Sequence, residues 1–544
     1  MPKIIVTSAL PYVYSMPHLG NLIGSVLPAD VYHRYLTLSG QDSIYICGSD
    51  QHGAKIEFEA IKRNISPKDL ANQMHETIKK ALSDFEIGFT YYGTTNSESN
   101  KEIVYQIFNA LYKNNCIIEK QDLQAYCTND NIFLFDRFIE GTCPYCHGTH
   151  ARGDQCDDCN KLLDPIQIID PHCNLCSKNT IEFRKVKNLA LSLDKLQEPI
   201  KNFIIKNSVN AWSKNAINQS LGLINQGLKS RDITRSLNWG FSVPLKGYED
   251  YVFYVWFDAP IGYIGITKEW NVNWEKYWKD KDTKLIQFMG KDNIDFHTIL
   301  FPAMLIGSNI GYILPTTIRA SEFLNSNGVK FSKSRGVGLD IKSALDVMNA
   351  DQWRFALMQL YPDGADTEFS IEILVEIINN ILNDKIGNLA NRVFTIIQRN
   401  TNIIIRRKDL GVKFSDQIDS IKNNYVFHFD NLDIKGALKN IVELADLGNS
   451  IMSSAAPWQL VKKPDDPKSM EELSMVMHTL LKIVRDIGIL LYPFTPTSSL
   501  KILAHFGIKN PKIELLTSMF EFDSSKDVHP IFSKIDSKMF EKFK

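Results

Sequence analysis

Six of the nine cysteines stand in three pairs of the form Cys-x-x-Cys. The pair Cys143/Cys146 is separated from the pair Cys156/Cys159 by a loop of nine residues. Two such pairs with a short loop between them match the spacing of a tetrahedral zinc site made of four thiolates. Four thiolates leave no open position for a substrate, so the pattern predicts a structural zinc ion rather than a catalytic one.

Two short segments far apart in the chain have residues suited to binding phosphate. His18, Gly20 and Asn21 open an expected helix after the first strand, where free backbone N–H groups and the helix dipole favour an anion. Lys330 and Lys333 belong to the segment KFSKSRG, whose cations could neutralise the charge of a triphosphate. Taken alone, each segment is better explained without a ligand, the first as a capped helix and the second as a solvated loop.

An α/β sheet is expected to position these segments. Apolar runs followed by polar residues predict parallel strands at Ile4–Val6, Ser43–Cys47, Tyr251–Trp256 and Leu285–Met289. Open α/β sheets bind ligands beyond the carboxyl ends of such strands. Because these strands form two groups, we expect one sheet divided by an insertion at about residues 116–232, which holds every Cys-x-x-Cys pair.

The last third of the chain predicts a bundle of helices. Apolar residues recur at intervals of three and four between residues 374 and 393, 437 and 445, and 475 and 487. Lys462–Lys468 predicts an exposed turn between helices.

Composition excludes several classes of protein. The 544 residues contain 61 Lys and Arg against 62 Asp and Glu, so a uniformly basic nucleic-acid coat is excluded, although a local basic face is not. With 44% apolar and 23% charged residues, disorder, collagen and a disulfide-rich secreted fold are also excluded. The first residues lack the apolar run and the cleavage site of a signal peptide, and the longest apolar stretch, Val252–Ile266, is shorter than the roughly 20 residues of a membrane span. We therefore expect a soluble, cytoplasmic protein that does not contact membranes.

Together, His-Leu-Gly-Asn from His18 and KFSKS from Lys330 resemble the two signatures of class I aminoacyl-tRNA synthetases. The flanking motifs resemble the methionyl-tRNA synthetase family, above all its archaeal and eukaryotic cytosolic branch. These motifs are ALPY, CGSDQHG, ARGDQCDDC, DITR, VFYVWFDAPIGY, GKDNIDFH and KFSKSRGVG. The chain differs from the commonest family pattern at Asn21, where a second His usually stands, but Asn is also a hydrogen-bond donor.

The resemblance implies a reaction in two steps. L-methionine and ATP give methionyl-adenylate and pyrophosphate, and the methionyl group then passes to the 3′ end of tRNA(Met) with release of AMP. His18, Gly20, Asn21, Lys330 and Lys333 would bind ATP, which Mg²⁺ accompanies. The residues that match the methionine pocket are Asp50, for the α-ammonium, and the wall residues Ala9, Leu10, Tyr12, Trp256, Ala259, Pro260, Tyr263 and His297.

The third cysteine pair leaves two alternatives open. Relatives with two zinc ions have a fourth Cys-x-x-Cys where this chain has Cys127 and Asp130. A second zinc site of Cys127, Asp130, Cys173 and Cys176 is one interpretation, and a degenerate or empty knuckle is the other.

The resemblance also assigns tRNA recognition to the helical bundle. Asn388 and Arg392 are four residues apart and share one helical face, and Trp458 offers a stacking surface for an unstacked base. These three residues would read the CAU anticodon. Arg406–Lys408 either contacts backbone phosphate or is simply solvated.

The expected fold class is α/β, a Rossmann-like class I catalytic domain with a zinc-knuckle insertion, followed by an all-α anticodon-binding bundle. Expected boundaries are 1–115 and 233–324 for the catalytic halves, 116–232 for the insertion, 325–370 for a linking module and 371–544 for the bundle. We expect a monomer, since no further tRNA-binding or dimerisation module follows the bundle. Two other functions stay open: a different class I specificity, and a non-catalytic paralogue that binds zinc and RNA.

Overall fold

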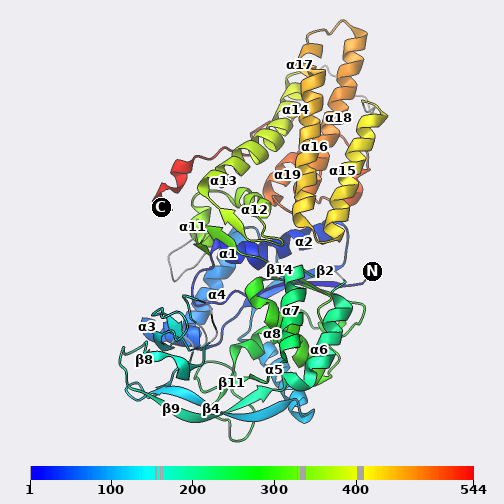
Figure 1. Cartoon of the computed structure of the whole chain (residues 1–544). Coiled ribbons are helices and arrows are strands. Elements are labelled where there is room, and N and C mark those ends of the chain that lie inside the picture. Colours follow the sequence, from blue (N-terminus) through cyan, green and yellow to red (C-terminus); the bar gives the residue numbers. More distant parts are fainter. Residues whose placement is uncertain are drawn as a thin grey trace.

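The structure is a computed structural model with an α/β half below an elongated bundle of helices (Figure 1). It describes residues 2–135, 138–153, 156–159, 161, 163–209, 211–326, 329–330, 339–400 and 410–543. Lys333 and Arg406–Lys408 therefore lie outside the described residues.

A five-stranded parallel sheet forms the centre of the α/β half, with the strand order β14-β13-β1-β2-β3. The strands are β1 (Ile4–Ser8), β2 (Ser43–Ser49), β3 (Tyr91–Thr94), β13 (Lys284–Gly290) and β14 (Thr317–Ser321). This order confirms the Rossmann-like fold class and the division of the sheet by an insertion. The strand order reverses between β1 and β13, which is the place where such sheets bind ligands.

Strand β1 is apolar at consecutive positions because helices cover both of its faces. Ile4 and Val6 belong to the cluster that includes α2, whereas Ile5 belongs to the cluster on the opposite face. The covering helices are α2 (Leu27–Leu38) on the first face, and α5 (Glu98–Lys113), α8 (Val255–Trp270) and α10 (Phe301–Ser308) on the second. The first cluster continues into the helical bundle, so the sheet and the bundle share one core.

One predicted strand is wrong. Within Tyr251–Trp256 only β12 (Val252–Phe253) is extended; it pairs antiparallel with β11 (Thr234–Arg235), outside the central sheet. Helix α8 begins at Val255. It is buried along most of its length, and an apolar run buried on all sides has no polar face to distinguish helix from strand.

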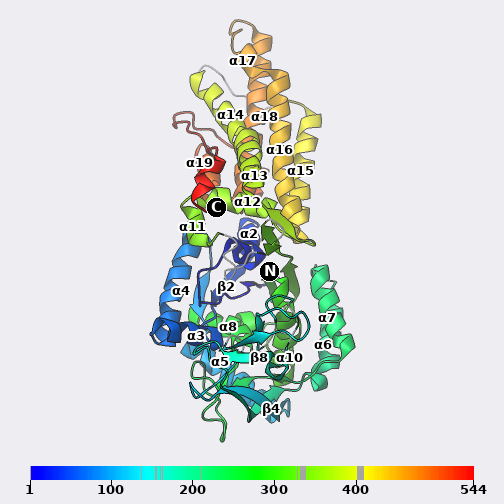
Figure 2. The same cartoon turned by 60° about the vertical axis from the view of Figure 1, so that its left-hand side comes forward.

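The insertion contains two small antiparallel sheets, ordered β10-β9-β4-β5 and β7-β6-β8. Their strands are β4 (Ile117–Cys127), β5 (Ile132–Phe133), β6 (Ile139–Thr142), β7 (Ala151–Arg152), β8 (Ile169–Cys173), β9 (Ile181–Leu191) and β10 (Arg231–Asp232). Helices α6 (Leu193–Asn207) and α7 (Lys214–Gln226) come between β9 and β10 in the chain. They lie on the opposite side of the molecule from α3 (Ala54–Arg63) and α4 (Pro67–Asp84) (Figure 2). The β4–β9 ribbon lies farthest from the helical bundle (Figure 1).

The last third is helical, as predicted. Its helices are α11 (Ile341–Leu345), α12 (Ala350–Gln359), α13 (Ile371–Glu376), α14 (Asn388–Arg399), α15 (Val412–Asp430), α16 (Ile434–Ala455), α17 (Pro457–Leu460), α18 (Pro467–Leu491) and α19 (Pro496–Ala504). A small sheet consists of β15 (Leu324–Ser326), β16 (Val329–Lys330) and β17 (Thr367–Phe369). Strands β15 and β16 precede these helices in the chain, and β17 lies between α12 and α13. Within the described ranges, no helix has both the length and the apolar character needed to cross a bilayer.

A buried arginine joins the α/β half to the bundle. Arg354 of α12 forms an ion pair with Asp30 of α2 at 2.6 Å, and both side chains are completely buried. Arg354 also donates to the carbonyl oxygens of Pro493 and Phe494 at 2.8 and 3.0 Å. Because breaking a buried pair leaves an uncompensated charge, this arrangement stabilises the relative position of the two halves.

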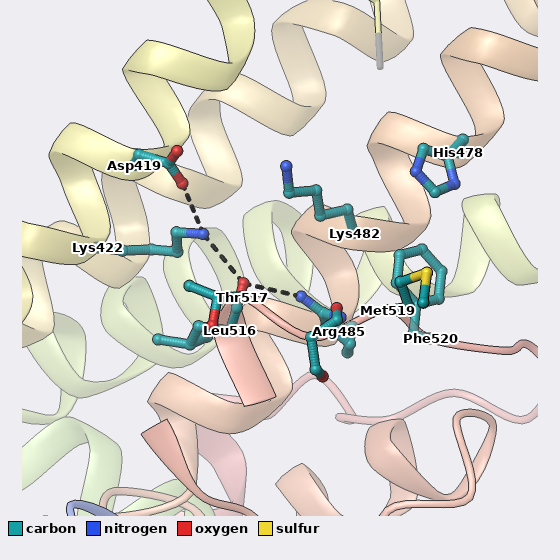
Figure 3. A pocket seen from close by; sticks show the side chains of 10 residues that line it. Asp419, Lys422, His478, Lys482, Arg485, Leu516, Thr517, Met519 and Phe520 are labelled. Atoms are coloured by element: carbon teal, nitrogen blue, oxygen red, sulfur yellow. Dashed lines mark hydrogen bonds and ion pairs between the residues drawn. The ribbon is translucent and has the colours of Figure 1, made fainter. Parts of the chain in front are cut away.

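A second group of buried cations holds the segment after α19 against the bundle. It lines a cavity of about 380 Å³ (Figure 3). Lys422 of α15 pairs with Asp419 at 2.8 Å and donates to the carbonyl oxygen of Leu516 at 3.3 Å. Arg485 of α18 pairs with Asp486 at 2.6 Å and likewise donates to the carbonyl of Leu516. Because both buried cations have protein partners, we interpret them as groups that stabilise this segment of the chain and not as ligand-binding groups.

Candidate active site

Asp50 lies just after β2, and its carboxylate is buried near the end of β1. Its backbone N–H donates to the carbonyl oxygen of Pro11 at 2.9 Å, and its carbonyl oxygen accepts from the N–H of Val13 at 3.2 Å. Oδ1 of Asp50 has no hydrogen-bond partner among the described residues. Burial and the nearby Asp258 carboxylate raise the pKa of Asp50 well above its ordinary value. A buried carboxylate with an unpaired oxygen is suited to a cationic ligand group.

Helix α8 contributes a row of predicted site residues. Trp256, Ala259, Pro260 and Tyr263 are three or four residues apart, so they lie along one face of this helix. Ala259, Pro260 and Tyr263 are buried, whereas Trp256 is only partly so. The structure therefore brings these four predicted residues into one wall.

Tyr263 forms a hydrogen bond with His297, a residue that follows β13 in the chain. The Tyr263 hydroxyl donates to Nε2 of His297 at 2.8 Å, and Nδ1–H of His297 donates to the carbonyl oxygen of Asn293 at 2.9 Å. Burial lowers the pKa of His297 to about 4, so the imidazole is neutral near pH 7. The pair of Tyr263 and His297 is therefore uncharged near pH 7.

Phe296 lies against this wall and was not named from the sequence. Its ring stacks on Trp256, with centroids 3.4 Å apart and planes 8° apart. Its position beside His297 in the motif GKDNIDFH was the available signal. Ala9 and Leu10 pack against the same apolar cluster as Trp256 and Phe296, and the N–H of Ala9 donates to a carbonyl of β13.

Tyr12 joins this wall to Asp50. The two residues form an isolated parallel bridge, which places Tyr12 at the end of β2. Its hydroxyl oxygen lies 3.0 Å from the position that a Cβ would take at Gly53, where φ is +102°. A larger residue at Gly53 would therefore be strained and would displace Tyr12.

The phosphate-binding candidates open the first helix, beside the switch point of the sheet. The helix begins as α1 (Leu19–Asn21) and continues through a π-helical turn (Leu22–Val26) into α2. Nδ1 of His18 accepts from the N–H of Asn21 at 3.1 Å, and the Asn21 side-chain oxygen accepts from the N–H of His18 at 3.1 Å. A neutral His18 in this arrangement has its proton on Nε2, which can donate to a ligand. Gly20 lies between them.

The second phosphate-binding segment is only partly described. The backbone of Lys330 ends β16 and pairs with Asn325 of β15. Lys333 follows outside the described residues.

The first cysteine cluster has the geometry of a metal site. The Sγ atoms of Cys143 and Cys159 are 3.8 Å apart, those of Cys146 and Cys156 are 3.7 Å apart, and all four lie within 4.8 Å of one another. Tetrahedral bonds of about 2.3 Å imply sulfur–sulfur distances of about 3.8 Å. The four thiolates could therefore hold a metal ion.

The second cluster comes together as well. Sγ of Cys127 lies 3.7 Å from Sγ of Cys176, and Oδ2 of Asp130 lies 3.0 Å from Sγ of Cys173 and 3.4 Å from Sγ of Cys127. The four donor atoms lie within 4.8 Å of one another. The donor set, three sulfurs and one carboxylate, is also one that could hold a metal ion.

Two of the three anticodon candidates meet at the end of the bundle away from the sheet (Figure 1). The guanidinium of Arg392 lies 5.5 Å from the ring centroid of Trp458, which is 40% exposed. Asn388 is exposed one helical turn before Arg392, and its side-chain amide donates to Asp384 at 3.1 Å. These side chains form a polar and aromatic surface suited to an unstacked base.

Comparisons with known proteins agree with this arrangement. A family model described as class I tRNA synthetases (M) matches residues 4–394, and the anticodon binding domain of methionyl tRNA ligase matches residues 408–542. The methionine–tRNA ligase of Pyrobaculum islandicum is 39% identical over 98% of this chain and 94% of its own length. That of Ignicoccus hospitalis is 39% identical over 100% and 97%, and that of Borrelia garinii 40% identical over 92% and 69%.

A solved structure shows the same fold. Mycobacterium tuberculosis methionyl-tRNA synthetase in complex with methionyl-adenylate superposes with a TM-score of 0.79, over 96% of this chain and 97% of that one, at 22% identity. The two family models and the near full-length relatives agree on a single assignment. The chain belongs to the methionyl-tRNA synthetase family of class I aminoacyl-tRNA synthetases.

Proposed function

We propose that the site beyond β1 and β2 performs the family's reaction, ligation of L-methionine to tRNA(Met). The methionine carboxylate attacks the α-phosphorus of ATP and expels pyrophosphate, and the terminal adenosine hydroxyl of the tRNA then attacks the adenylate and releases AMP. No covalent intermediate with the enzyme is needed, so catalysis depends on positioning and on stabilising charge. The observation that best supports this proposal is the buried Asp50 carboxylate, one oxygen of which has no partner among the described residues, beside the apolar and aromatic wall of α8.

The methionine would lie with its ammonium at Asp50 and its side chain against the wall of α8. Stacked Trp256 and Phe296 and the small Ala259 suit a flexible thioether, which makes favourable contacts with aromatic rings. The neutral imidazole of His297 would border the thioether without placing a charge beside the sulfur.

ATP-dependent exchange of pyrophosphate, run with each of the twenty amino acids, tests this function. Exchange with methionine alone is the expected result. Exchange with another amino acid would keep the class of enzyme and overturn the pocket. A folded, metal-loaded protein without exchange would favour the RNA-binding paralogue.

ATP would bind at the start of α1, with Nε2 of His18 and the amide of Asn21 on its phosphates and Mg²⁺ beside them. Lys330 and Lys333 would stabilise the departing pyrophosphate.

Truncation of a group that acts on the transition state costs about 3–4 kcal/mol, so Lys333→Ala should slow exchange by roughly 10²–10³-fold. Calorimetry should find methionine affinity unchanged in this variant, because the amino acid binds elsewhere. Normal exchange in Lys333→Ala would refute this role.

The exposed surface at Arg392, Asn388 and Trp458 would bind the CAU anticodon. Stacking on an aromatic ring is worth about 1–3 kcal/mol per base, so Trp458→Ala should lower kcat/KM for tRNA(Met) roughly 10–100-fold. Pyrophosphate exchange should not change, because α17 is remote from the sheet (Figure 1). The matched control is Phe427→Ala, which removes an aromatic side chain that is 63% exposed on α15. Equal losses in both variants would argue against a specific anticodon contact.

We also propose zinc as the ion of both cysteine clusters, since three or four thiolates with tetrahedral spacing favour it. The enzyme would act in the cytoplasm, where its tRNA is used, and as a monomer. Light scattering from purified protein, with and without tRNA, checks the oligomeric state.

A further inference from the structure

A buried histidine–carboxylate pair lies beside Asp50, and the reaction described above makes no use of it. Nδ1 of His52 and Oδ2 of Asp258 are 2.5 Å apart, and both side chains are about 1% exposed. His52 comes from the loop after β2 that also contains Asp50. Asp258 comes from α8, between Trp256 and Tyr263. The pair therefore connects the two segments that form the pocket.

The surroundings of His52 fix the orientation of its ring. Nε2 lies 3.2 Å from the side-chain oxygen of Asn96, so both ring nitrogens face oxygen atoms. The rings of Trp239 and Phe241 meet the imidazole edge to face, with centroids 5.5 and 4.6 Å away. Nδ1–H of His52 can therefore donate to the Asp258 carboxylate.

His52 also contacts Asp50 through its main chain. The backbone N–H of His52 donates to the Asp50 carboxylate, an interaction that favours the ionised form. The side chain of His52 is meanwhile anchored to α8 through Asp258. Movement of the imidazole would therefore move a hydrogen-bond donor of Asp50.

The charge of Asp258 opposes the ionisation of Asp50. Both carboxylates are buried, Asp258 completely so, and Asp258 raises the pKa of Asp50. Oδ1 of Asp258 has no hydrogen-bond partner among the described residues, so the contact with His52 is the main compensation visible for this charge. Burial raises the pKa of Asp258 and its contact with His52 lowers it, so the contact favours the ionised form. An ionised Asp258 without that contact would repel the Asp50 carboxylate more strongly.

We propose that His52 and Asp258 are positioning residues for the amino end of methionine. The pair compensates the charge of Asp258 and fixes the loop after β2, so that Asp50 stays ionised and directed at the substrate ammonium. The effect acts on recognition of the ammonium and not on recognition of the thioether. This inference rests on the proposed role of Asp50.

Two substitutions at His52 separate the hydrogen bond from the bulk of the ring. His52→Asn places an amide near the position of Nδ1 and keeps a donor for Asp258, whereas His52→Gln moves the amide toward the position of Nε2. Loss of a hydrogen bond to a charged group predicts a Kd for L-methionine roughly 10–100-fold higher in His52→Gln. His52→Asn should stay within a few-fold of the wild-type enzyme, and weak binding by both variants alike would contradict the proposal.

A ligand without the ammonium distinguishes positioning from general damage to the pocket. 4-(Methylsulfanyl)butanoate keeps the thioether and the carboxylate of methionine but has no amino group. Its affinity should be the same for the wild-type enzyme and for His52→Gln. An equal loss for both ligands would mean that His52 merely supports the fold, and the proposal would fall.

The double variant His52→Gln/Asp258→Asn tests the electrostatic part. If the uncompensated charge of Asp258 weakens binding, removing that charge should restore methionine affinity to within a few-fold of the wild-type value. A double variant as weak as His52→Gln would overturn this part. His428→Gln is the matched control, because it breaks a 2.7 Å contact with Asp433 in the bundle and should leave methionine affinity unchanged.

Asp50→Asn, measured in parallel, tells the two proposals apart. Unchanged methionine affinity in Asp50→Asn would overturn the proposed role of Asp50 itself. A loss in Asp50→Asn without a loss in His52→Gln would overturn only the role of the His52–Asp258 pair.

Discussion

Asp50→Asn is expected to lower kcat/KM for methionine in pyrophosphate exchange by roughly 10²–10³-fold, with KM for ATP little changed. Breaking a buried ion pair by removing one partner costs about 3–5 kcal/mol, because the other charge is left uncompensated. In this variant the uncompensated charge would be the substrate ammonium. Asp42→Asn is the matched control, since Asp42 is exposed just before the opposite end of the same strand, β2. A comparable loss in Asp42→Asn would indicate damage to the strand instead.

The same residue predicts a pH dependence. Burial and Asp258 raise the pKa of Asp50, so this carboxyl group is protonated up to a higher pH than an ordinary aspartate. Only the ionised form attracts the ammonium, so KM for methionine should fall as the pH rises through that pKa. Asp50→Asn should flatten this profile, and a variant that kept the wild-type profile would show that another group titrates.

Removal of a metal ion from the four-cysteine cluster is also expected to have a large effect, here on the stability of the insertion. Structural zinc contributes about 10–16 kcal/mol of binding free energy in small zinc-dependent folds, and much of that is folding free energy. The strands around the cluster are short, with β6 four residues long and β7 two residues long. Cys143→Ala or strong chelation should therefore unfold this part of the insertion. Limited proteolysis between residues 138 and 173 would detect it.

The unfolding should also reach the active site. Phe58 of α3 packs edge to face against Phe138, with ring centroids 5.0 Å apart, and α3 directly follows the loop that contains Asp50 and His52. Pyrophosphate exchange should therefore fall together with zinc content measured by mass spectrometry. Cys116→Ser removes a buried thiol outside both clusters and should leave metal and activity unchanged. Full exchange in metal-free protein would show that the insertion folds independently of zinc.

The sequence predicted the elements whose burial in the structure matches their pattern of apolar residues. Strands β1 and β2 are apolar runs because both faces of the sheet are covered, and the bundle helices have a periodic apolar face. Strands β3 and β14 were not predicted, because their sequences YYGT and TIRAS are short and contain small polar residues. The first part of helix α8 was predicted as a strand, because a segment that is buried on all sides has no polar face to reveal the helical period.

Prediction of the site had a similar limit. Pocket residues within family motifs could be named from their position in the chain, and the structure brings Tyr12 to Asp50 and Tyr263 to His297. Phe296 needed the stacked ring of Trp256 to be recognised. The His52–Asp258 pair joins residues 206 positions apart, and no local pattern marks such a contact.

The position of β1 in the sheet has a consequence for synthesis of the chain. Thr7 of β1 lies opposite Gln287 of β13, so one side of this central strand lacks its partner until about 280 more residues have been made. At about 5–20 residues per second, that delay is roughly 15–60 s. During this time a sheet of β1 and β2 would have an open edge of unpaired N–H and C=O groups. The nascent chain is most exposed to wrong strand pairing at this stage, and chaperone binding there would protect the yield of folded enzyme.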